Sequence, residues 1–312
     1  MVAFMQPNES YVTVSDGVRL FCQHVGDHAA ALLIPNALYL FEDFRRLAAR
    51  RTLIFFDLRN RGRSDAVVDP SKLRRGIHED VDDLDAVRRH FGFDTVDVLG
   101  HSYLGLTVTL YAMKYSEHVN RVVQIGPAPP RAGTQYPAHL AGADSVLSDV
   151  LGKMGQLYGQ TGADPRESCR KIWALLRMLY VGDPADAAKL HWEPCDVPNE
   201  LNFMRYWNAH VLPSIQQLEL GAPDYARVKA PVLTIHGAKD RSAPYGGGRE
   251  WAMLLPDARL LTIKSAAHVP WIEEPEAVFG AIATFLDGAW PESVEKVTVL
   301  DPGGTAGAPP LR

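Results

Sequence analysis

The stretch VDVLGHSYLG, residues 96–105, joins an apolar run, a serine between glycines and the start of a helical pattern. The apolar run before the serine predicts a strand that is covered on both faces. Residues 103–115 then show helical spacing. Ser102 is therefore expected on a tight strand-to-helix turn, where its hydroxyl is exposed at the carboxyl edge of a sheet, close to a helix N-terminus.

This serine motif is compatible with two roles. Ser102 can act as a nucleophile, or it can simply cap the helix that begins at Tyr103. The motif also departs from the pattern G-x-S-x-G, since Leu104 occupies the fifth position and the glycine follows at Gly105. The turn must then accommodate a branched side chain. The residues further along the chain favour the catalytic role.

A serine hydroxyl is a weak nucleophile, so it needs a general base and a carboxylate that orients that base. Asp240 follows the apolar run APVLTIHG at 230–237, and His268 follows the run ARLLTIK at 258–264. Serine, aspartate and histidine, each in a loop after a predicted strand, predict a catalytic triad of Ser102, Asp240 and His268. Asp224 is a weaker alternative acid because it precedes its strand.

Acyl transfer also requires two backbone N–H groups that face the developing oxyanion. One is expected from Tyr103, the residue after the serine. The other is expected from the loop Pro35-Asn36-Ala37-Leu38, which follows the apolar run at 30–34. Because proline has no N–H, Ala37 is the predicted donor and Asn36 the reserve. A left-handed backbone is plausible at Asn36, which is also a candidate for substrate binding.

The segment DLRNRGRS at 57–64 predicts a structural loop after the strand 52–56. We expect it to support the turn at Ser102 through Asp57 and Arg59, and Asn60 is a second candidate for a left-handed backbone. His101 and His236 are expected to hold structural hydrogen bonds, the latter next to the Asp240 loop. The remaining histidines show no paired spacing, so no metal site and no cofactor are expected.

Along the chain, an antiparallel hairpin at 11–22 comes before alternating apolar runs and helical segments, which predict βαβ crossovers and a parallel sheet. From residue 128 the apolar runs stop until residue 230, and helical spacing with glycine and proline breaks takes their place. We therefore expect a core at 1–127 and 225–290, a helical cap at 128–224 and a flexible C-terminal tail at 291–312.

The composition is that of an ordinary globular protein. A net charge of -5 without a basic stripe disfavours nucleic acid and anionic membranes as partners. The start of the chain has no signal-peptide pattern, and three cysteines without CxxC spacing predict reduced thiols and no disulfide. A cytoplasmic protein with a small-molecule substrate is expected, and its oligomeric state stays open.

Four motifs, GHSYLG, DLRNRGRS, IHGAKDRSAP and AAHVPWIEEPE, together resemble the α/β-hydrolase superfamily. The resemblance implies an α/β fold with a mostly parallel eight-stranded sheet flanked by helices, a helical cap insertion and a cofactor-free hydrolase. It is greatest to the branch of proline iminopeptidase-like and small-molecule esterase-like enzymes. The loop at 35–37 lacks the HGGPG of proline iminopeptidases, and a serine nucleophile differs from the aspartate of haloalkane dehalogenases and epoxide hydrolases.

The cap is expected to determine the substrate because it covers the serine. Its aromatic residues favour a bulky, fairly apolar carboxylic ester or lactone, such as a macrocyclic lactone, and its acidic residues Glu193 and Glu200 are expected to be solvated. Alternatives are a proline iminopeptidase-like amide hydrolase, and a non-hydrolytic enzyme or small-molecule receptor on the same fold. Substrate contacts are predicted for Trp173, Trp192, Phe203 and Trp207.

Overall fold

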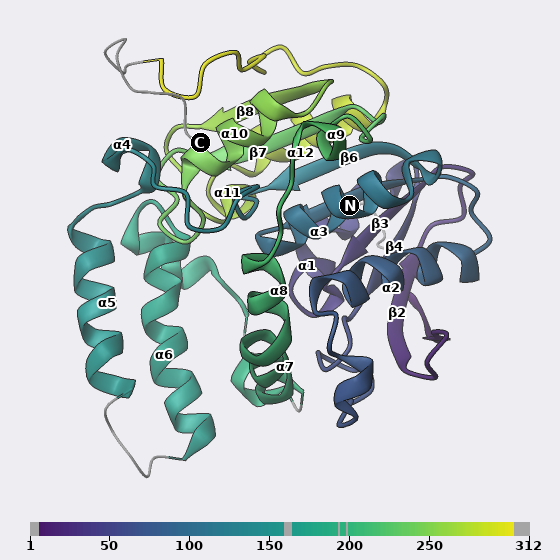
Figure 1. Ribbon diagram of the computed structural model, residues 1–312, viewed down its shortest axis with the longest axis horizontal. Coiled ribbons are helices and arrows are strands. Elements are labelled where there is room, and N and C mark those ends of the chain that lie inside the picture. The colour runs from purple at the N-terminus through teal and green to yellow at the C-terminus, as the bar shows by residue number, and fades with distance from the viewer. Residues whose placement is uncertain (1–5, 159–163, 193, 198, 303–312) are drawn as a thin grey trace.

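A single mixed sheet of eight strands forms the centre of the molecule, in the order β1-β2-β4-β3-β5-β6-β7-β8. The computed structural model describes residues 6–158, 164–192, 194–197 and 199–302 (Figure 1). β1, β2 and β4 pair antiparallel, and every pair from β4 to β8 is parallel. This confirms the expected fold class. The strands are β1 (Asn8–Thr13), β2 (Arg19–Val25), β3 (Ala31–Pro35), β4 (Thr52–Phe56), β5 (Val96–His101), β6 (Val119–Ile125), β7 (Val232–Gly237) and β8 (Ala258–Ile263).

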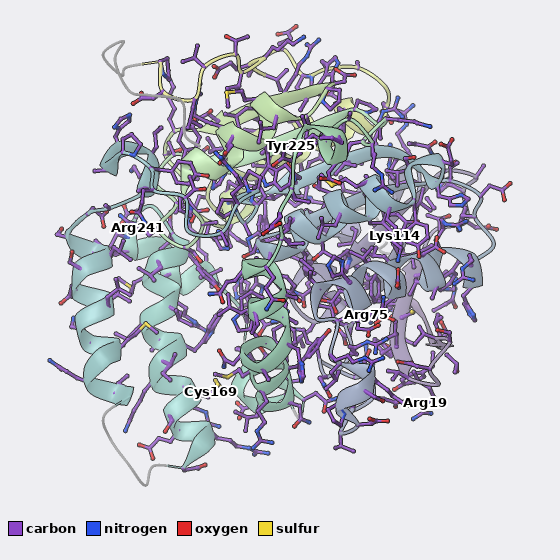
Figure 2. The ribbon with its side chains drawn as sticks, viewed as in Figure 1. Arg19, Arg75, Lys114, Cys169, Tyr225 and Arg241 are labelled. Carbon is purple, nitrogen blue, oxygen red and sulfur yellow. A yellow bond between two sulfur atoms is a disulfide. The ribbon has the colours of Figure 1, made fainter. Side chains whose placement is uncertain are left out.

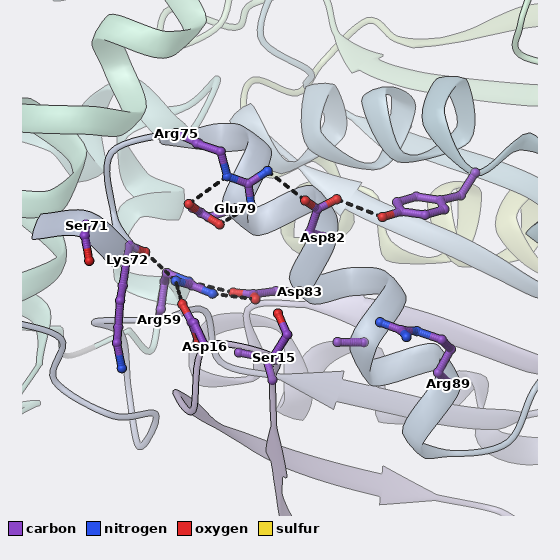
Figure 3. Close-up of a pocket in the computed structure, with 13 residues that line it drawn as sticks. Ser15, Asp16, Arg59, Ser71, Lys72, Arg75, Glu79, Asp82, Asp83 and Arg89 are labelled. Carbon is purple, nitrogen blue, oxygen red and sulfur yellow. Dashed lines mark hydrogen bonds and ion pairs between the residues drawn. The ribbon is translucent and has the colours of Figure 1, made fainter. Parts of the chain in front are cut away.

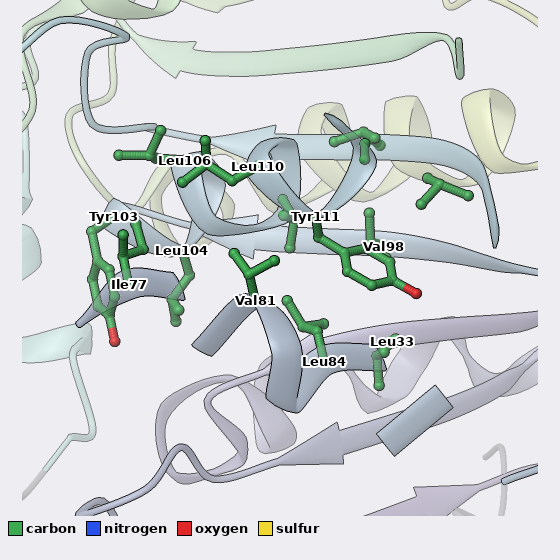
Figure 4. Close-up of a cluster of buried hydrophobic side chains, with 14 of the residues drawn as sticks. Leu33, Ile77, Val81, Leu84, Val98, Tyr103, Leu104, Leu106, Leu110 and Tyr111 are labelled. Atoms are coloured by element: carbon green, nitrogen blue, oxygen red, sulfur yellow. The ribbon is translucent and has the colours of Figure 1, made fainter. Parts of the chain in front are cut away.

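Helices cover both faces of this sheet, because alternate side chains of each strand point to opposite faces. In β3, Leu33 packs in the cluster beneath α2 and α3, while Leu32 and Ile34 pack in the cluster beneath α1 and α12. Figure 4 shows Leu33 and Val98 facing the apolar side chains of α2 and α3. The continuous apolar runs of the sequence are explained by this two-sided burial.

The core helices lie between the strands in sequence, as right-handed crossovers require. Among the helices of the described ranges, none combines the length and the apolar character that crossing a membrane requires. The core helices are α1 (Ala37–Phe44), α2 (Ile77–His90), α3 (Tyr103–Lys114), α10 (Tyr245–Leu254), α11 (Pro270–Glu273) and α12 (Pro275–Leu286), with short 3-10 turns at Arg45–Ala49, Pro70–Lys72 and Ser116–His118.

The segment between β6 and β7 is helical, as expected, and we call it the cap. α5 and α6 lie side by side as a hairpin that projects from the core (Figure 1). α8 packs on α2, where Ser214 Oγ accepts a hydrogen bond from the N–H of Ile77 at 2.9 Å. The cap helices are α4 (Ala138–Ala141), α5 (Ser145–Tyr158), α6 (Pro165–Tyr180), α7 (Glu200–Tyr206), α8 (Leu212–Gln216) and α9 (Ala222–Tyr225), with a π-helical turn at Trp207–Val211 and 3-10 turns at Pro184–Lys189 and Pro194–Asp196.

A disulfide joins two parts of the cap, so the expectation of reduced thiols was wrong for two of the three cysteines. Cys169 on α6 is bonded to Cys195 in the 3-10 turn, with 5.7 Å between their Cα atoms (Figure 2). Cys22 is free and buried in β2. The two partners are 26 residues apart without a recognisable motif, so only the folded cap brings them together. The disulfide removes one of the supports for a cytoplasmic location.

Part of the predicted flexible tail lies against the sheet. Glu295 forms an antiparallel bridge with Leu260 of β8 and an ion pair with Arg249 at 3.0 Å. Val297 is buried, with 4% of its surface exposed. Residues 291–302 are therefore docked on the edge of the core, and residues 303–312 lie outside the described ranges.

The disulfide predicts a measurable stabilisation of the cap. Cys169→Ser should lower the free energy of unfolding by about 3 kcal/mol, because the bond closes a loop of 26 residues in the unfolded chain. Urea denaturation of both proteins checks this value, and dithiothreitol should lower the stability of wild type but not of the variant. Alkylation of denatured wild type should modify one cysteine without reductant and three with it; three without reductant would contradict the bond.

Candidate functional site

Ser102 lies at the junction of β5 and α3 in a backbone conformation that is rare for a residue with a side chain. Its φ of 60° and ψ of -132° lie outside the usual regions, at a cost of about 1–3 kcal/mol. The turn is held by hydrogen bonds from the N–H of Ser102 to the carbonyl of Ile125 at 2.9 Å and from the N–H of Ala128 to the carbonyl of Ser102 at 3.1 Å. Such strain at an ordered turn is typical of a functional position.

Two glycines make this turn possible. A Cβ on Gly100 would lie 2.1 Å from the carbonyl oxygen of Leu104, and a Cβ on Gly105 would lie 2.9 Å from Cβ of Pro127. Leu104 itself is buried in the apolar cluster beneath α3, with 1% of its surface exposed. The shifted glycine of the motif therefore has a steric reason, since it is position 105 that approaches the neighbouring backbone.

Asp240 and His268 form a buried pair at the same edge of the sheet. Oδ2 of Asp240 lies 2.8 Å from Nδ1 of His268 and 3.1 Å from Nε2 of His236. Oδ1 accepts the N–H groups of Ser242 and Ala243, both at 2.8 Å. Burial alone would raise the pKa of Asp240, but attraction to His268 and the hydrogen bonds from both histidines outweigh burial and lower that pKa well below its usual range. The carboxylate stays ionised and fixes the imidazole of His268.

The backbone of His268 is held by the cap. The carbonyl oxygen of Tyr180, the last residue of α6, accepts the N–H groups of His268 at 2.9 Å and Val269 at 3.2 Å. The ring of His268 lies between those of His101 and Tyr180, at centroid distances of 4.5 and 4.9 Å. Nothing in the sequence pattern singled out Tyr180, because a backbone carbonyl carries no side-chain signature.

Nε2 of His268 is the free end of this pair. The atom is buried and has no hydrogen-bond partner among the described residues, so the hydroxyl of Ser102 does not hydrogen-bond to it in this structure. Contacts of this kind are often long in unliganded enzymes and shorten when substrate binds. The side chain of His101 is anchored elsewhere, with Nε2 at 2.9 Å from the carbonyl oxygen of His268.

The loop before α1 has the expected unusual geometry. Asn36 has a φ of 85° and Asn60 a φ of 61°, so both candidate positions are left-handed. Ala37 and Tyr103 each begin a helix, where the first N–H groups have no intrahelical acceptor and are free to bind an anion. Oδ1 of Asn36 is buried without a partner among the described residues.

Asp57 and Arg59 have other roles than the expected support of the Ser102 turn. Oδ1 of Asp57 accepts the N–H of Leu38 at 2.8 Å, so this carboxylate fixes the first turn of α1. Arg59 instead pairs with Asp83 on α2 at 2.7 Å and with Asp16, between β1 and β2, at 2.9 Å. The sequence placed both residues in one loop correctly but could not show which neighbour each side chain reaches.

Trp173 and Trp192 lie on the histidine side of the site. They stack on one another at 6.1 Å between centroids, and Trp192 lies 5.0 Å from Tyr39 and 6.3 Å from His101. Both tryptophans are half-buried. The structure therefore brings these two predicted substrate contacts next to α1 and the end of β5.

Phe203 and Trp207 lie on the serine side. Their rings are 6.2 and 4.9 Å from that of Tyr103, the residue after Ser102. The guanidinium of Arg61 lies over the ring of Phe203, 3.8 Å from its centroid. Aromatic groups of the cap thus flank the site on both sides.

Glu200 is buried, which overturns the expectation that it is solvated. It is 7% exposed and accepts a hydrogen bond from the hydroxyl of Tyr39 at 2.8 Å. Nη2 of Arg61 lies 3.3 Å from the same oxygen, Oε1. Helix α7 carries Glu200 into the interface between cap and core, a placement that helical spacing alone does not specify. Glu193, its predicted companion, lies outside the described residues.

Two cavities lie near the loops of the core, and neither is lined by Ser102, Asp240 or His268. One of about 350 Å³ is bordered by Ala37, Tyr39, Gly62 and Trp192, and so adjoins the start of α1. Ser102 itself is half-buried.

The other cavity, of about 450 Å³, lies between the β1–β2 turn and α2 (Figure 3). Several of its charged side chains pair with one another, as Arg75 does with Glu79 and Asp82 and as Arg59 does with Asp83. These ion pairs give the charged lining of the cavity a structural role, because they join α2 to the loops around it. Across the described ranges, no group of three histidine, cysteine or acidic side chains is placed to hold a metal ion.

Comparison with known proteins gives a family match and distant relatives. The family model described as alpha/beta hydrolase fold matches residues 34–151. The chain is 25% identical to proline iminopeptidase PfmaB of Pestalotiopsis fici, over 79% of this chain and 85% of that protein. It is 26% identical to the (lyso)-N-acylphosphatidylethanolamine lipase of Homo sapiens, over 76% of this chain and 71% of that protein.

Among solved structures, an esterase from Exiguobacterium antarcticum superimposes with a TM-score of 0.69. The two share 15% sequence identity over 91% of this chain and 100% of that one. The superposition establishes the shared fold and, at so low an identity, nothing beyond the fold. The relatives carry different activities by name, so they do not identify a substrate.

Gly126 lies against the Asp240–His268 pair and provides a geometric test of it. A Cβ at this position would lie 3.1 Å from Nδ1 of His268 and 3.2 Å from Oδ2 of Asp240. Gly126→Ala should therefore disturb their hydrogen bond, and the downfield NMR signal of the Nδ1 proton should shift or disappear. Gly92→Ala is the control, because Gly92 also has a positive φ but a Cβ there would meet no atom within 4 Å. It should lose about 1 kcal/mol of stability with the signal intact.

The lowered pKa of Asp240 predicts a pH-dependent contribution to stability. Because the folded-state pKa lies below the unfolded value of about 3.9, the carboxylate stabilises the fold above that pH and loses this contribution as the pH falls through the folded-state pKa. Asp240→Asn should lower the free energy of unfolding by about 3 kcal/mol at pH 7 and by less at pH 3.5. Urea denaturation at both pH values measures this.

The matched control is Asp149→Asn, which removes an exposed partner of Lys153 on α5 and should change stability by less than about 0.5 kcal/mol. An equal loss for Asp240→Asn at both pH values would contradict the lowered pKa.

Proposed function

Because this chain has the α/β-hydrolase fold, and its residues 34–151 match the model of that family, we propose that it is a serine hydrolase that cleaves a carboxylic ester or lactone through an acyl-enzyme intermediate. Ser102 is the nucleophile, His268 the general base and Asp240 the carboxylate that orients it. The observation that carries this proposal is the strained turn at Ser102 on the same sheet edge as the buried Asp240–His268 pair.

In the first step, Nε2 of His268 takes the hydroxyl proton of Ser102 while Oγ bonds to the substrate carbonyl carbon. Asp240 stabilises the imidazolium that results. The carbon–oxygen bond to the leaving alcohol then breaks, and the alcohol receives the proton from His268. A water molecule deacylates Ser102 by the same sequence of proton transfers, which restores the serine. The unpaired Nε2 atom supports this role, since it has no competing partner among the described residues.

The tetrahedral intermediate carries a negative charge that needs hydrogen-bond donors. We assign this role to the N–H groups of Ala37 and Tyr103, the first residues of α1 and α3. The left-handed backbone of Asn36 and the bond from Leu38 to Asp57 orient the first of these helices. Both donors are thus part of rigid elements and need no reorganisation during the reaction.

The substrate class follows from the cap. Trp173, Trp192, Phe203 and Trp207 favour a bulky acyl or alcohol group, for which a macrocyclic lactone is one candidate. An amide hydrolase that recognises an amine would need a carboxylate with its charge available. Glu200 is the buried cap carboxylate, but Arg61 already compensates its charge, so an ester or lactone is favoured over an amino-terminal amide.

An activated Ser102 should react with a fluorophosphonate. Intact-mass spectrometry of wild type should show one adduct, and Ser102→Ala should show none while retaining its fold by circular dichroism. Hydrolysis of an ester and lactone panel should fall by about 10³-fold or more in the same variant. Prolyl amides in the panel test the alternative activity.

Ser148→Ala serves as the control, because Ser148 is exposed on α5 and should leave both adduct and turnover unchanged. An adduct that persists in Ser102→Ala would refute the assignment of the nucleophile. The absence of any adduct, together with no turnover, would favour a receptor or a non-hydrolytic enzyme.

A further inference from the structure

A group of buried polar side chains lies where the cap meets the core, and we call it the Arg61 cluster. It consists of Tyr39 on α1, Arg61 in the loop after β4, Tyr103 on α3 and Glu200 on α7. All four residues are buried, with at most 8% of their surface exposed. Glu200 binds Tyr39 and Arg61 through Oε1, so this one carboxylate joins cap and core.

Three polar atoms of the cluster lack hydrogen-bond partners among the described residues. They are Nε of Arg61, the hydroxyl of Tyr103 and Oε2 of Glu200. Burial raises the pKa of Tyr103 well above its usual value, and the nearby guanidinium of Arg61 opposes this increase. A buried polar group without a partner costs about 1–3 kcal/mol, so three in one place require an explanation.

The cluster is next to the proposed reactive groups. Tyr103 directly follows Ser102. Tyr180 is close to both groups of residues, since its hydroxyl interacts electrostatically with Arg61 and Glu200 of the cluster and also with Asp240. The ring of Tyr180 also lies 4.9 Å from that of His268. The cavity of about 350 Å³ reaches Tyr39 and Gly62, the residue after Arg61, and so provides space beside the cluster.

The charges of the cluster determine which ligand group it suits. Arg61 and Glu200 compensate each other, so a cationic group would be repelled by Arg61 and an anionic group by Glu200. Asp80 lies behind Tyr103, and burial together with the neighbouring Asp83 raises its pKa well above the usual value, which favours its neutral form. The unpaired atoms are a donor on Arg61, an acceptor on Glu200 and a hydroxyl on Tyr103 that can be either. A neutral group that both donates and accepts hydrogen bonds fits this arrangement.

We propose that the Arg61 cluster binds a hydroxyl group of the substrate, so that the preferred ester or lactone is hydroxylated near its scissile carbonyl. The hydroxyl donates to Oε2 of Glu200 and accepts from the hydroxyl of Tyr103. This inference rests on the proposed function and specifies its substrate class. A plain hydrocarbon chain would leave all three polar atoms unpaired, which is how such a site discriminates.

Binding can be tested without turnover in the Ser102→Ala protein. The ligands are phenyl hexanoate and its 3-hydroxy and 6-hydroxy derivatives, and the readout is the fluorescence of the tryptophans in the cap. At least one hydroxy ester should bind about tenfold more tightly than phenyl hexanoate, the gain expected from one well-placed hydrogen bond. Equal affinity for all three ligands would overturn the proposal.

Variants in the same background locate the effect. Glu200→Gln and Tyr103→Phe should each reduce the preference for the hydroxy ester at least threefold, whereas Glu219→Gln, at an exposed glutamate of the cap, should leave it unchanged. If Glu200→Gln does not fold, Tyr103→Phe tests the proposal by itself, because this substitution removes only one hydroxyl and is therefore less disruptive to the fold. A preference that persists in the folded variants would assign the hydroxyl to another part of the site and refute the role of the cluster.

Fluorophosphonate labelling and hydrolysis of phenyl hexanoate by wild type separate this inference from the proposed function. Labelling and hydrolysis without any hydroxyl preference in binding would retain the serine hydrolase and reject the cluster as a hydroxyl site. Hydroxyl preference in the Ser102→Ala protein without labelling of wild type would support the binding site and reject the hydrolase.

Discussion

The close approach of β5, α3 and β6 around Ser102 is the constraint on which the site depends. The chain must leave a central strand and enter a helix within one residue, and it does so only because Gly100 and Gly105 have no Cβ to collide with Leu104 and Pro127. The strain at Ser102 is offset by the surrounding packing and by backbone hydrogen bonds to the neighbouring strand end. The serine is consequently fixed at the carboxyl edge of the sheet, where the loops after β7 and β8 also begin.

The pair Asp240–His268 is a second rigid unit at this edge. Four hydrogen bonds satisfy the carboxylate, two from backbone N–H groups and two from histidines, so burial of its charge is compensated. Its attachment to the cap is less expected. The carbonyl of Tyr180 holds the backbone of His268, which means that a displacement of α6 would also move the imidazole.

The cap therefore contributes more than a cover. The disulfide at Cys169 restricts its internal freedom, Glu200 joins it to Arg61, and its aromatic residues pack against Tyr39 and Tyr103 on the two sides of the serine. Burial strengthens the hydrogen bond between Asp240 and His268 and makes every unpaired polar atom costly. The same burial makes the unpaired polar atoms of the Arg61 cluster selective, in our proposal, for a ligand that can form hydrogen bonds with them.

The sequence by itself determined the order of strands and helices along the chain, the presence of a helical insertion, the turn at Ser102 and the left-handed asparagines, because apolar periodicity and local backbone sterics are encoded within a few neighbouring residues. It also indicated Asp240 and His268, since each follows a recognisable strand. Only the tertiary structure decided that Glu200 is buried against Arg61, that Cys169 is bonded, that Asp57 orients α1 and that Tyr180 holds His268. These contacts join segments far apart in the chain, and their partners are selected by packing geometry, which leaves no periodic signal in the sequence.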